Sequence, residues 1–295
     1  MLNGVGKSQV NCLDISPNRR YIAVGAYTHV KLYGITSNCN DTAVLHLDKI
    51  KNVTAVGYQQ EGNWLFTVSE DMVARIWDLR SRTHNCTRSR KIDSPIACGF
   101  LHPNQKDLLF GDQEGRVHCW DLAKDSITSF KLHGDGDTSV QSIAVDPEAT
   151  MFAALTMDGV IHNWNLNASH PTFPQHYPRS LAHEKYGLKC LFSPDSTNLV
   201  TCSADRTAKI WLTSNLFIKP SPETKFITTT PSVVLEDDSQ KWVWDCAFSK
   251  DSHYLITASS DCNARLWDLV SGEKKRDYQG HQKPITCMAF RDENF

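Results

Sequence analysis

The sequence predicts an all-β fold in which one four-strand unit is repeated along the chain. The first observation is a short segment that recurs six times, with its aromatic residue 43 to 56 residues from the next. The copies are ARIWDL at 74–79, VHCWDL at 117–122, IHNWNL at 161–166, AKIWLT at 208–213, ARLWDL at 264–269 and the weaker VKLYGI at 30–35. The second observation is enrichment in β-branched and aromatic residues without helical periodicity. A period of this length indicates stacked or radially arranged repeats.

The elements of each unit follow in a fixed order. A first strand ends in a polar or proline-containing turn, as in LDISPN, FLHPNQ, AVDPEA, LFSPDS and AFSKDS. A short second strand comes next, as in LVTCSAD and LITASSD, and a tight turn leads into the aromatic strand. Such a unit cannot bury both of its faces alone, whereas radial stacking of copies buries them. We therefore expect a β-propeller.

The unit boundaries predict one propeller domain over residues 9–295 after a short tail at 1–8. The approximate repeats are 9–50, 51–92, 93–136, 137–183, 184–239, 240–281 and a partial repeat at 282–295. GHQKPITCMAF at 280–290 begins this last unit and supplies only its first strand. We expect a sequence that lacks an N-terminal half-blade, in preference to a six-bladed ring with one extra strand. Uncovered blade faces and a free strand edge would lower its stability.

The repeats resemble those of the WD-repeat β-propellers, which implies seven blades in the complete ring. The signature positions are Trp77, Asp78, Trp120, Asp121, Trp164, Trp267 and Asp268. The resemblance also implies that one blade carries the family's hydrogen-bonded structural tetrad, made by His183, Ser203, Asp205 and Trp211. A Ser/His/Asp set could also be a hydrolase triad. We favour the structural interpretation because the set belongs to the repeat and no GxSxG elbow accompanies it.

Composition narrows the function classes. With 22% charged residues, 40% hydrophobic residues and a net charge of −2, the chain has the character of a soluble protein and not of a nucleic-acid binder. No window is apolar enough for a transmembrane helix, and the N-terminus lacks a signal-peptide core. The ten cysteines stand mostly alone in strand-like segments without a CxxC pair, so we expect reduced, buried thiols and no metal. We expect no catalytic residues and no cofactor.

One end of the first strands forms a candidate protein-binding rim. In most units, the residues that lie six and four positions before the end of the first strand are polar. In the first unit these residues are Gln9 and Asn11. Two neighbouring units instead carry large apolar ones, namely Tyr186, Leu188, Trp242 and Trp244. Aromatic clusters of this kind are typical of binding hot spots. The alternative is that Trp244 only packs against the next blade.

Longer segments narrow the family further. ARIWDLRSR, GDQEGRVHCWDL, FSPDSTNLVTCSADRTAKIW and CAFSKDSHYLITASSDCNARLWDLVSGEKKRDYQGHQK resemble the G-protein-beta-like small subunits of target-of-rapamycin (TOR) kinase complexes. The resemblance implies a non-catalytic scaffold that binds and stabilises the TOR kinase domain and supports assembly with other TOR-complex subunits. It also implies a kinase-facing rim at Gln9, Asn11, Trp242 and Trp244.

The same resemblance implies a cytoplasmic protein that reaches lysosomal or other endomembrane surfaces through its complex. It implies no nucleic-acid partner, no direct membrane insertion and no small-molecule substrate. The alternative is another WD-repeat scaffold such as a G-protein beta-like adaptor. A true G-protein beta subunit would need an N-terminal coiled-coil helix, which MLNGVGKSQV does not supply.

Overall fold

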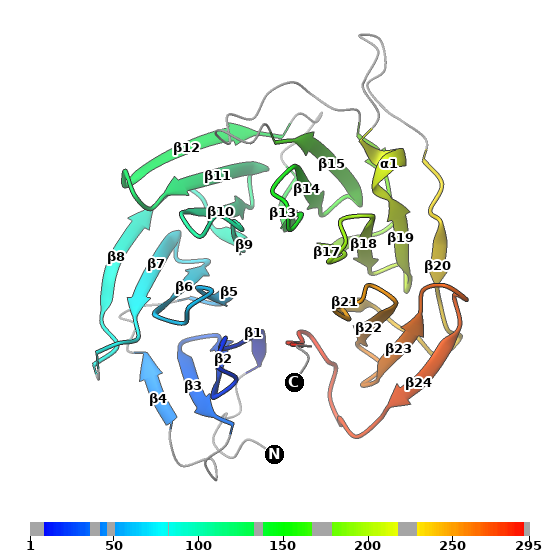
Figure 1. The fold of residues 1–295 in the computed structure, drawn as a ribbon, viewed down its shortest axis with the longest axis horizontal. Helices are drawn as coiled ribbons and strands as arrows, with labels where there is room; N and C mark the ends of the chain where they lie inside the picture. Colours follow the sequence, from blue (N-terminus) through cyan, green and yellow to red (C-terminus); the bar gives the residue numbers. More distant parts are fainter. Residues whose placement is uncertain are drawn as a thin grey trace.

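Six four-stranded antiparallel sheets are arranged around a common centre, as the ribbon in Figure 1 shows. The computed structural model describes residues 9–35, 42–45, 51–81, 83–132, 138–166, 179–217 and 229–291. The first three sheets comprise β1 (Val10–Ile15), β2 (Tyr21–Ala26), β3 (Val30–Gly34), β4 (Thr42–Leu45); β5 (Val53–Tyr58), β6 (Trp64–Ser69), β7 (Val73–Asp78), β8 (Cys86–Lys91); β9 (Ile96–Leu101), β10 (Asp107–Asp112), β11 (Arg116–Asp121) and β12 (Ser126–Lys131).

The other three sheets continue the ring in chain order. They comprise β13 (Val140–Val145), β14 (Met151–Thr156), β15 (Val160–Asn165), β16 (Ser180–Leu181); β17 (Gly187–Phe192), β18 (Asn198–Ser203), β19 (Ala208–Leu212), β20 (Val233–Leu235); β21 (Val243–Phe248), β22 (Tyr254–Ser259), β23 (Ala264–Asp268) and β24 (Lys274–Tyr278). Each sheet lies within one of the six complete repeat ranges, and the six-blade arrangement confirms the predicted propeller class.

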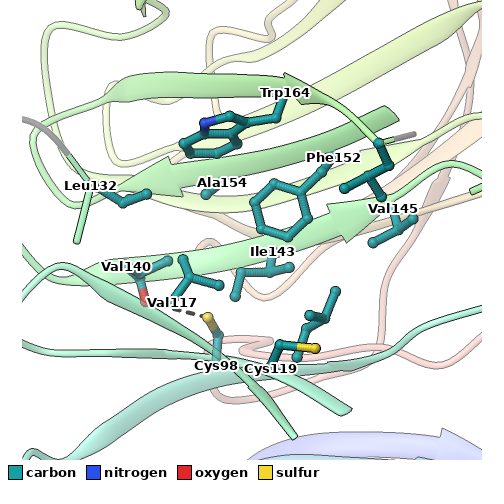
Figure 2. Close-up of a cluster of buried hydrophobic side chains, with 12 residues drawn as sticks. Cys98, Val117, Cys119, Leu132, Val140, Ile143, Val145, Phe152, Ala154 and Trp164 are labelled. Carbon is teal, nitrogen blue, oxygen red and sulfur yellow. Dashed lines mark hydrogen bonds between the residues drawn. The ribbon is translucent and has the colours of Figure 1, made fainter. Parts of the chain in front are cut away.

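The outer strands of three blades are much more exposed than the strands inside them. The second strand β10 is wholly buried, whereas the outer strands β8, β12 and β24 are largely exposed. The core therefore consists of apolar layers between neighbouring blades. Figure 2 shows one such layer, in which Trp164 and Phe152 of the fourth sheet lie over Val117 and Cys119 of the third.

Every inner strand contains an irregularity at the same place. The pairing of β21 with β22 shifts between Val243 and Asp245, so Trp244 is an extra residue in the ladder. Equivalent shifts occur in the other five inner strands, where the extra residues are Asn11, Thr54, Ala97, Gln141 and Leu188. A β-bulge redirects the side chain of its extra residue. The sequence pattern did not predict these bulges.

Two features differ from the expected pattern of strands and turns. A single helical turn, α1 (Thr213–Leu216), follows β19, where the repeat pattern predicted only a turn between strands. The predicted first strand of a seventh unit is not a strand in the described residues up to 291. This segment is instead extended chain between β1 and β21, where Thr286 Oγ1 donates to Val10 O (2.7 Å) and Met288 N to an Asp245 carboxylate oxygen (2.8 Å).

Candidate functional site: an aromatic rim and the central channel

Three aromatic side chains from two neighbouring blades form a partly exposed cluster, which we call the aromatic rim cluster: Tyr186, Trp242 and Trp244. The rings of Tyr186 and Trp242 meet edge to face, with centroids 6.2 Å apart and an interplanar angle of 86°. The Trp242 and Trp244 centroids are 5.6 Å apart. Tyr186 is 49% exposed and Trp242 is 40% exposed. Large apolar side chains that contact one another and remain this exposed are typical of protein-binding surfaces.

The backbone on each side of the cluster is fixed by the tight turns of its own blade. The Tyr186 carbonyl accepts a hydrogen bond from Ala204 N (2.9 Å), in the turn between β18 and β19. The Trp242 carbonyl accepts one from Ser260 N (2.9 Å), in the turn between β22 and β23. Both rings therefore project from anchored chain, which reduces the entropy that a partner would have to remove on binding.

The six bulge residues line a central channel of about 500 Å³. Gln9, Asn11, Leu188 and Trp244 are among its lining residues, whereas Tyr186 and Trp242 lie outside that lining. The structure thus divides the predicted partner-binding residues into two groups that meet at Trp244. Trp244 is half-buried; it lines the channel and also contacts Trp242 of the outer pair. Trp242 precedes the inner strand and Trp244 is the extra residue of its bulge, and of the two only Trp244 lines the channel.

A polar network lies on the same rim near the first two blades. Asn11 Nδ2 donates to Asn52 Oδ1 (2.6 Å), and Asn52 Nδ2 donates to Glu70 Oε1 (2.9 Å). Sequence reasoning identified Asn11 and missed Glu70. The signal was present, because Glu70 lies in the same turn as Ser69 and Asp71, at the end of the blade where the rim residues lie.

The described residues that line the channel include an ion pair and several buried thiols. Lys189 Nζ lies 3.4 Å from Asp245 Oδ1, and this carboxylate raises the pKa of the lysine. Burial raises the pKa of the Cys98 thiol to about 12 and that of Cys190 to about 12. These thiols are protonated near pH 7 and are poor nucleophiles.

The predicted structural tetrad is present with one residue changed. His183 Nδ1 lies 2.7 Å from Asp205 Oδ2, and His183 Nε2 lies 2.8 Å from the Oγ1 atom of Thr201. Trp211 Nε1 donates to the same Thr201 oxygen (2.9 Å). The bridging hydroxyl is therefore that of Thr201 and not that of Ser203, whose Oγ accepts from Asp205 N (3.0 Å).

Strand geometry explains the correction. Trp211 pairs with Leu199 across the ladder, so Thr201 is its diagonal neighbour two residues along β18. Ser203 is about 7 Å farther along the strand, beyond the reach of the indole. Since a carboxylate only accepts, His183 Nδ1 carries the proton shared with Asp205, and in a neutral ring Nε2 then accepts the Thr201 hydroxyl proton while the same oxygen accepts from the indole. His183, Thr201 and Trp211 are buried and their polar side-chain atoms are paired within this chain, as suits a structural role.

The same threonine position recurs in two further blades. Trp77 Nε1 donates to Thr67 Oγ1 (3.0 Å), and Trp267 Nε1 donates to Thr257 Oγ1 (2.9 Å). Trp120 differs, since its indole donates to Asp125 Oδ1 (3.0 Å). Trp164 is stacked with His162 at a centroid distance of 6.0 Å. The signature aspartates Asp78, Asp121 and Asp268 cap the following turns through backbone amides.

Acid stability should depend measurably on Asp205. Burial alone would raise its pKa, but hydrogen bonds from His183 and Thr207 lower it from 3.8 to about 2. Because the folded-state pKa lies below the unfolded value, this group stabilises the fold above about pH 4 and loses the contribution as pH falls toward 2. The contribution is about 2 kcal/mol. Asp205→Asn should lower the free energy of unfolding in urea by about that amount at pH 7 and by much less near pH 2. An equal loss at both pH values would contradict the assignment.

Neither a metal centre nor a membrane span is found in the part of the chain that the structure describes. Those residues include no group of three His, Cys, Asp or Glu side chains placed to hold a metal ion. The same residues include no helix of the length and apolarity needed to cross a bilayer.

Known proteins match this sequence over nearly the whole chain. The "WD domain, G-beta repeat" family matches residues 2–33, 42–78, 175–211 and 221–268. The target of rapamycin complex subunit LST8 of Bos taurus is 44% identical over 289 residues, which cover 97% of this chain and 86% of that protein.

Two more distant relatives match over similar lengths. The protein LST8 homolog of Drosophila melanogaster is 37% identical over 98% of this chain and 88% of its own length. The target of rapamycin complex subunit LST8 of Saccharomyces cerevisiae is 38% identical over 97% of this chain and 89% of its own length. The chain therefore belongs to the LST8 family of WD40-repeat proteins.

Proposed function

We propose that this protein is a non-catalytic scaffold subunit of TOR complexes, which binds and stabilises the TOR kinase domain. The observation that carries the proposal is the aromatic rim cluster, an exposed group of contacting aromatic side chains on anchored chain. Relatives that are 38% and 44% identical to the chain over the aligned residues bear the name target of rapamycin complex subunit. On the basis of that name, we propose a TOR-complex protein as the partner that binds the aromatic rim cluster.

The cluster has the chemistry of an interface centre. Tryptophan and tyrosine bury large apolar areas while keeping few rotatable bonds, so they are enriched among hot-spot residues. The channel side adds amide groups at Gln9 and Asn11 for polar contacts around the apolar centre. We propose that a segment of the kinase domain covers Trp242 and Tyr186 and reaches the channel at Trp244, with Leu188 completing the apolar surface.

A scaffold role fits the chemistry of the groups that resemble catalytic ones. His183 and Asp205 use their polar atoms within the blade, and the channel thiols are protonated near neutral pH. We propose that the protein works in the cytoplasm and reaches lysosomal or other endomembrane surfaces through its complex. Its proposed partners are the kinase domain and other TOR-complex subunits, without nucleic acid, direct membrane insertion or a small-molecule substrate.

A stability measurement on the kinase tests the proposal. The TOR kinase domain would be heated alone and with a tenfold excess of this protein, and its unfolding midpoint recorded. A partner that binds only the folded kinase raises the midpoint by mass action, with a shift that grows as the concentration of the partner increases. We expect such a shift, and no phosphotransfer by this protein alone. An unchanged kinase midpoint at all concentrations would contradict the proposal.

A further inference from the structure

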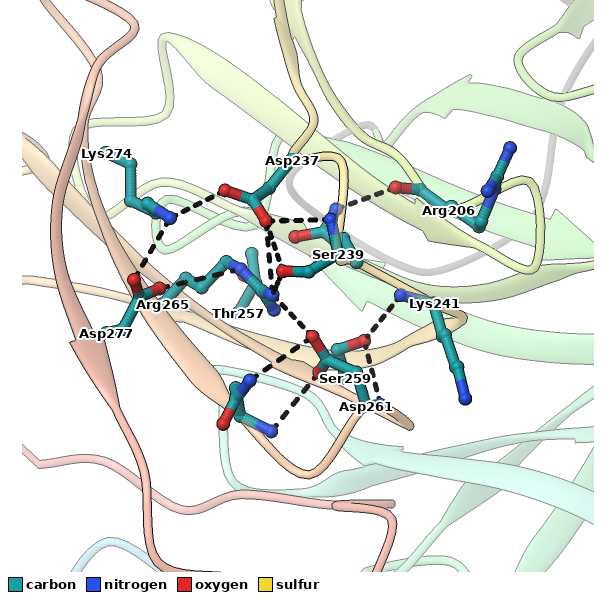
Figure 3. A network of polar contacts seen from close by, with 12 residues as sticks. Arg206, Asp237, Ser239, Lys241, Thr257, Ser259, Asp261, Arg265, Lys274 and Asp277 are labelled. Atoms are coloured by element: carbon teal, nitrogen blue, oxygen red, sulfur yellow. Dashed lines mark hydrogen bonds and ion pairs between the residues drawn. The ribbon is translucent and has the colours of Figure 1, made fainter.

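Arg265 is a buried cation at the centre of an ionic cluster in the sixth blade. It lies on β23 and is 1% exposed. Figure 3 shows its guanidinium between three carboxylates. Arg265 Nη2 forms an ion pair with Asp261 and lies 3.4 Å from Asp237 Oδ1, and Nε lies 3.6 Å from Asp277 Oδ1. A buried arginine is tolerated only with such partners.

The cluster connects an outer strand to the loop that leads into the inner strand. Lys274 Nζ on β24 lies 2.6 Å from Asp237 Oδ2 and 3.0 Å from Asp277 Oδ2. Arg265 Nη2 also donates to Ser239 Oγ (2.8 Å), and Ser239 N donates to Asp237 Oδ1 (3.1 Å). The cluster thus fixes residues 237–239 from two strands at once (Figure 3).

These loop residues lie directly before Trp242 in the chain. Gln240 Nε2 donates to the Arg206 carbonyl of the neighbouring blade (2.7 Å), and Lys241 N donates to Ser259 Oγ (3.2 Å). The Trp242 carbonyl then accepts from Ser260 N (2.9 Å). Every residue from Asp237 to Trp242 except Asp238 therefore has a hydrogen bond to a fixed part of these two blades, and Arg265 holds the beginning of this run.

The loop before the inner strand is anchored differently in the fifth and sixth blades. In the fifth blade, His183 lies four residues before the inner strand and anchors the corresponding loop to Asp205. In the sixth blade the same position is Ser239, and the anchoring cation is Arg265, four residues after Asp261. Lys209 is the matching residue of the fifth blade, and its Nζ donates to Ala182 O (2.8 Å) in the leading loop. Arg75 of the second blade pairs with Asp71 (2.7 Å) within its own turn.

We propose that Arg265 is a positioning residue of the docking face, which orients Trp242 against Tyr186 by holding the 237–241 loop through Asp237 and Ser239. The inference rests on the proposed function, because the aromatic rim cluster is the surface that it organises. Arginine suits this position because Nη2 contacts Asp261, Asp237 and Ser239 while Nε faces Asp277, whereas lysine offers a single nitrogen.

The test separates the position of Trp242 from kinase binding. The protein would be labelled with 5-fluorotryptophan, and the Trp242 resonance assigned with Trp242→Phe. Asp237→Asn, Ser239→Ala and Arg265→Lys would be compared with Arg75→Lys, the same change at a cation that pairs within its own turn. Each form would also be titrated with the TOR kinase domain. The Trp267 resonance reports on the interior of the same blade, where Trp267 donates to Thr257.

We expect Asp237→Asn and Arg265→Lys to shift or broaden the Trp242 resonance and to weaken kinase binding by about tenfold, and Asp237→Asn to leave the Trp267 resonance unchanged. Arg75→Lys should change neither property. If Arg265→Lys does not fold, the Trp242 resonance and the kinase affinity of Asp237→Asn still test the positioning role. Wild-type values for both Trp242 and the affinity in Asp237→Asn and Ser239→Ala would overturn the inference. If wild type itself does not bind the kinase while Trp242 still moves in the variants, the positioning role stands and the proposed function is wrong.

Discussion

Replacing Trp242 with alanine is expected to weaken binding of the TOR kinase domain by about 30- to 1000-fold, the loss that follows when a hot-spot aromatic is removed. The indole is 40% exposed and packs edge to face on Tyr186, so its removal also leaves the tyrosine without its neighbour. Trp244→Ala should weaken binding as well, because Trp244 joins the outer pair to the channel. The affinity would be measured by titration calorimetry or surface plasmon resonance.

Tyr254→Ala is the matched control for this substitution. Tyr254 begins β22 at the opposite end of the same blade and is likewise 40% exposed. Loss of this aromatic group should leave the affinity within about twofold of wild type, because surface substitutions away from an interface have small effects. Equal affinities for Trp242→Ala and wild type, with both proteins folded, would show that the aromatic rim cluster is not the docking face.

The second large effect concerns stability and follows from the corrected tetrad. Thr201→Val should lower the free energy of unfolding by about 2–5 kcal/mol, because it leaves both the Trp211 donor and the His183 Nε2 acceptor buried without a partner. Valine has nearly the shape of threonine, so the loss reports on hydrogen bonding and not on a cavity. Urea unfolding followed by circular dichroism measures it.

Ser203→Ala provides the comparison within the same strand. Ser203 is also buried, and its Oγ accepts only the Asp205 amide among the hydrogen bonds described here. Its removal should cost about 0.5–1.5 kcal/mol, the usual net contribution of one such bond. A larger loss for Ser203→Ala than for Thr201→Val would restore Ser203 as the bridging residue.

The propeller could be predicted from the sequence because its signals are local and repeated. A tryptophan strand and a turn recur every 43 to 56 residues, and each blade needs the same few features at the same spacing. The aromatic rim cluster was predicted for the same reason, since Tyr186 and Trp242 hold equivalent positions in neighbouring blades. Equivalent positions of adjacent repeats lie side by side once the repeats stack.

The details that sequence reasoning missed depend on distances across strands. The choice between Thr201 and Ser203 depends on which hydroxyl lies diagonally opposite Trp211. The two side chains lie on the same face of β18 because they are two residues apart, so strand alternation does not distinguish them. The bulges at Trp244 and its equivalents follow from the way β21 and the other inner strands meet their neighbours. The three carboxylates around Arg265, those of Asp237, Asp261 and Asp277, come from three separate segments of the chain. No short sequence motif therefore predicts the cluster.

Photocrosslinking from the rim tests the central claim most directly. A p-benzoylphenylalanine side chain would replace Tyr186 in one form of the protein and Tyr254 in another, and each would be irradiated with the TOR kinase domain. Both positions are well exposed and lie at opposite ends of their blades. We predict an ultraviolet-dependent crosslink to the kinase domain from position 186 and none from position 254. Crosslinking from position 254 alone would place the kinase on the opposite face and contradict the account.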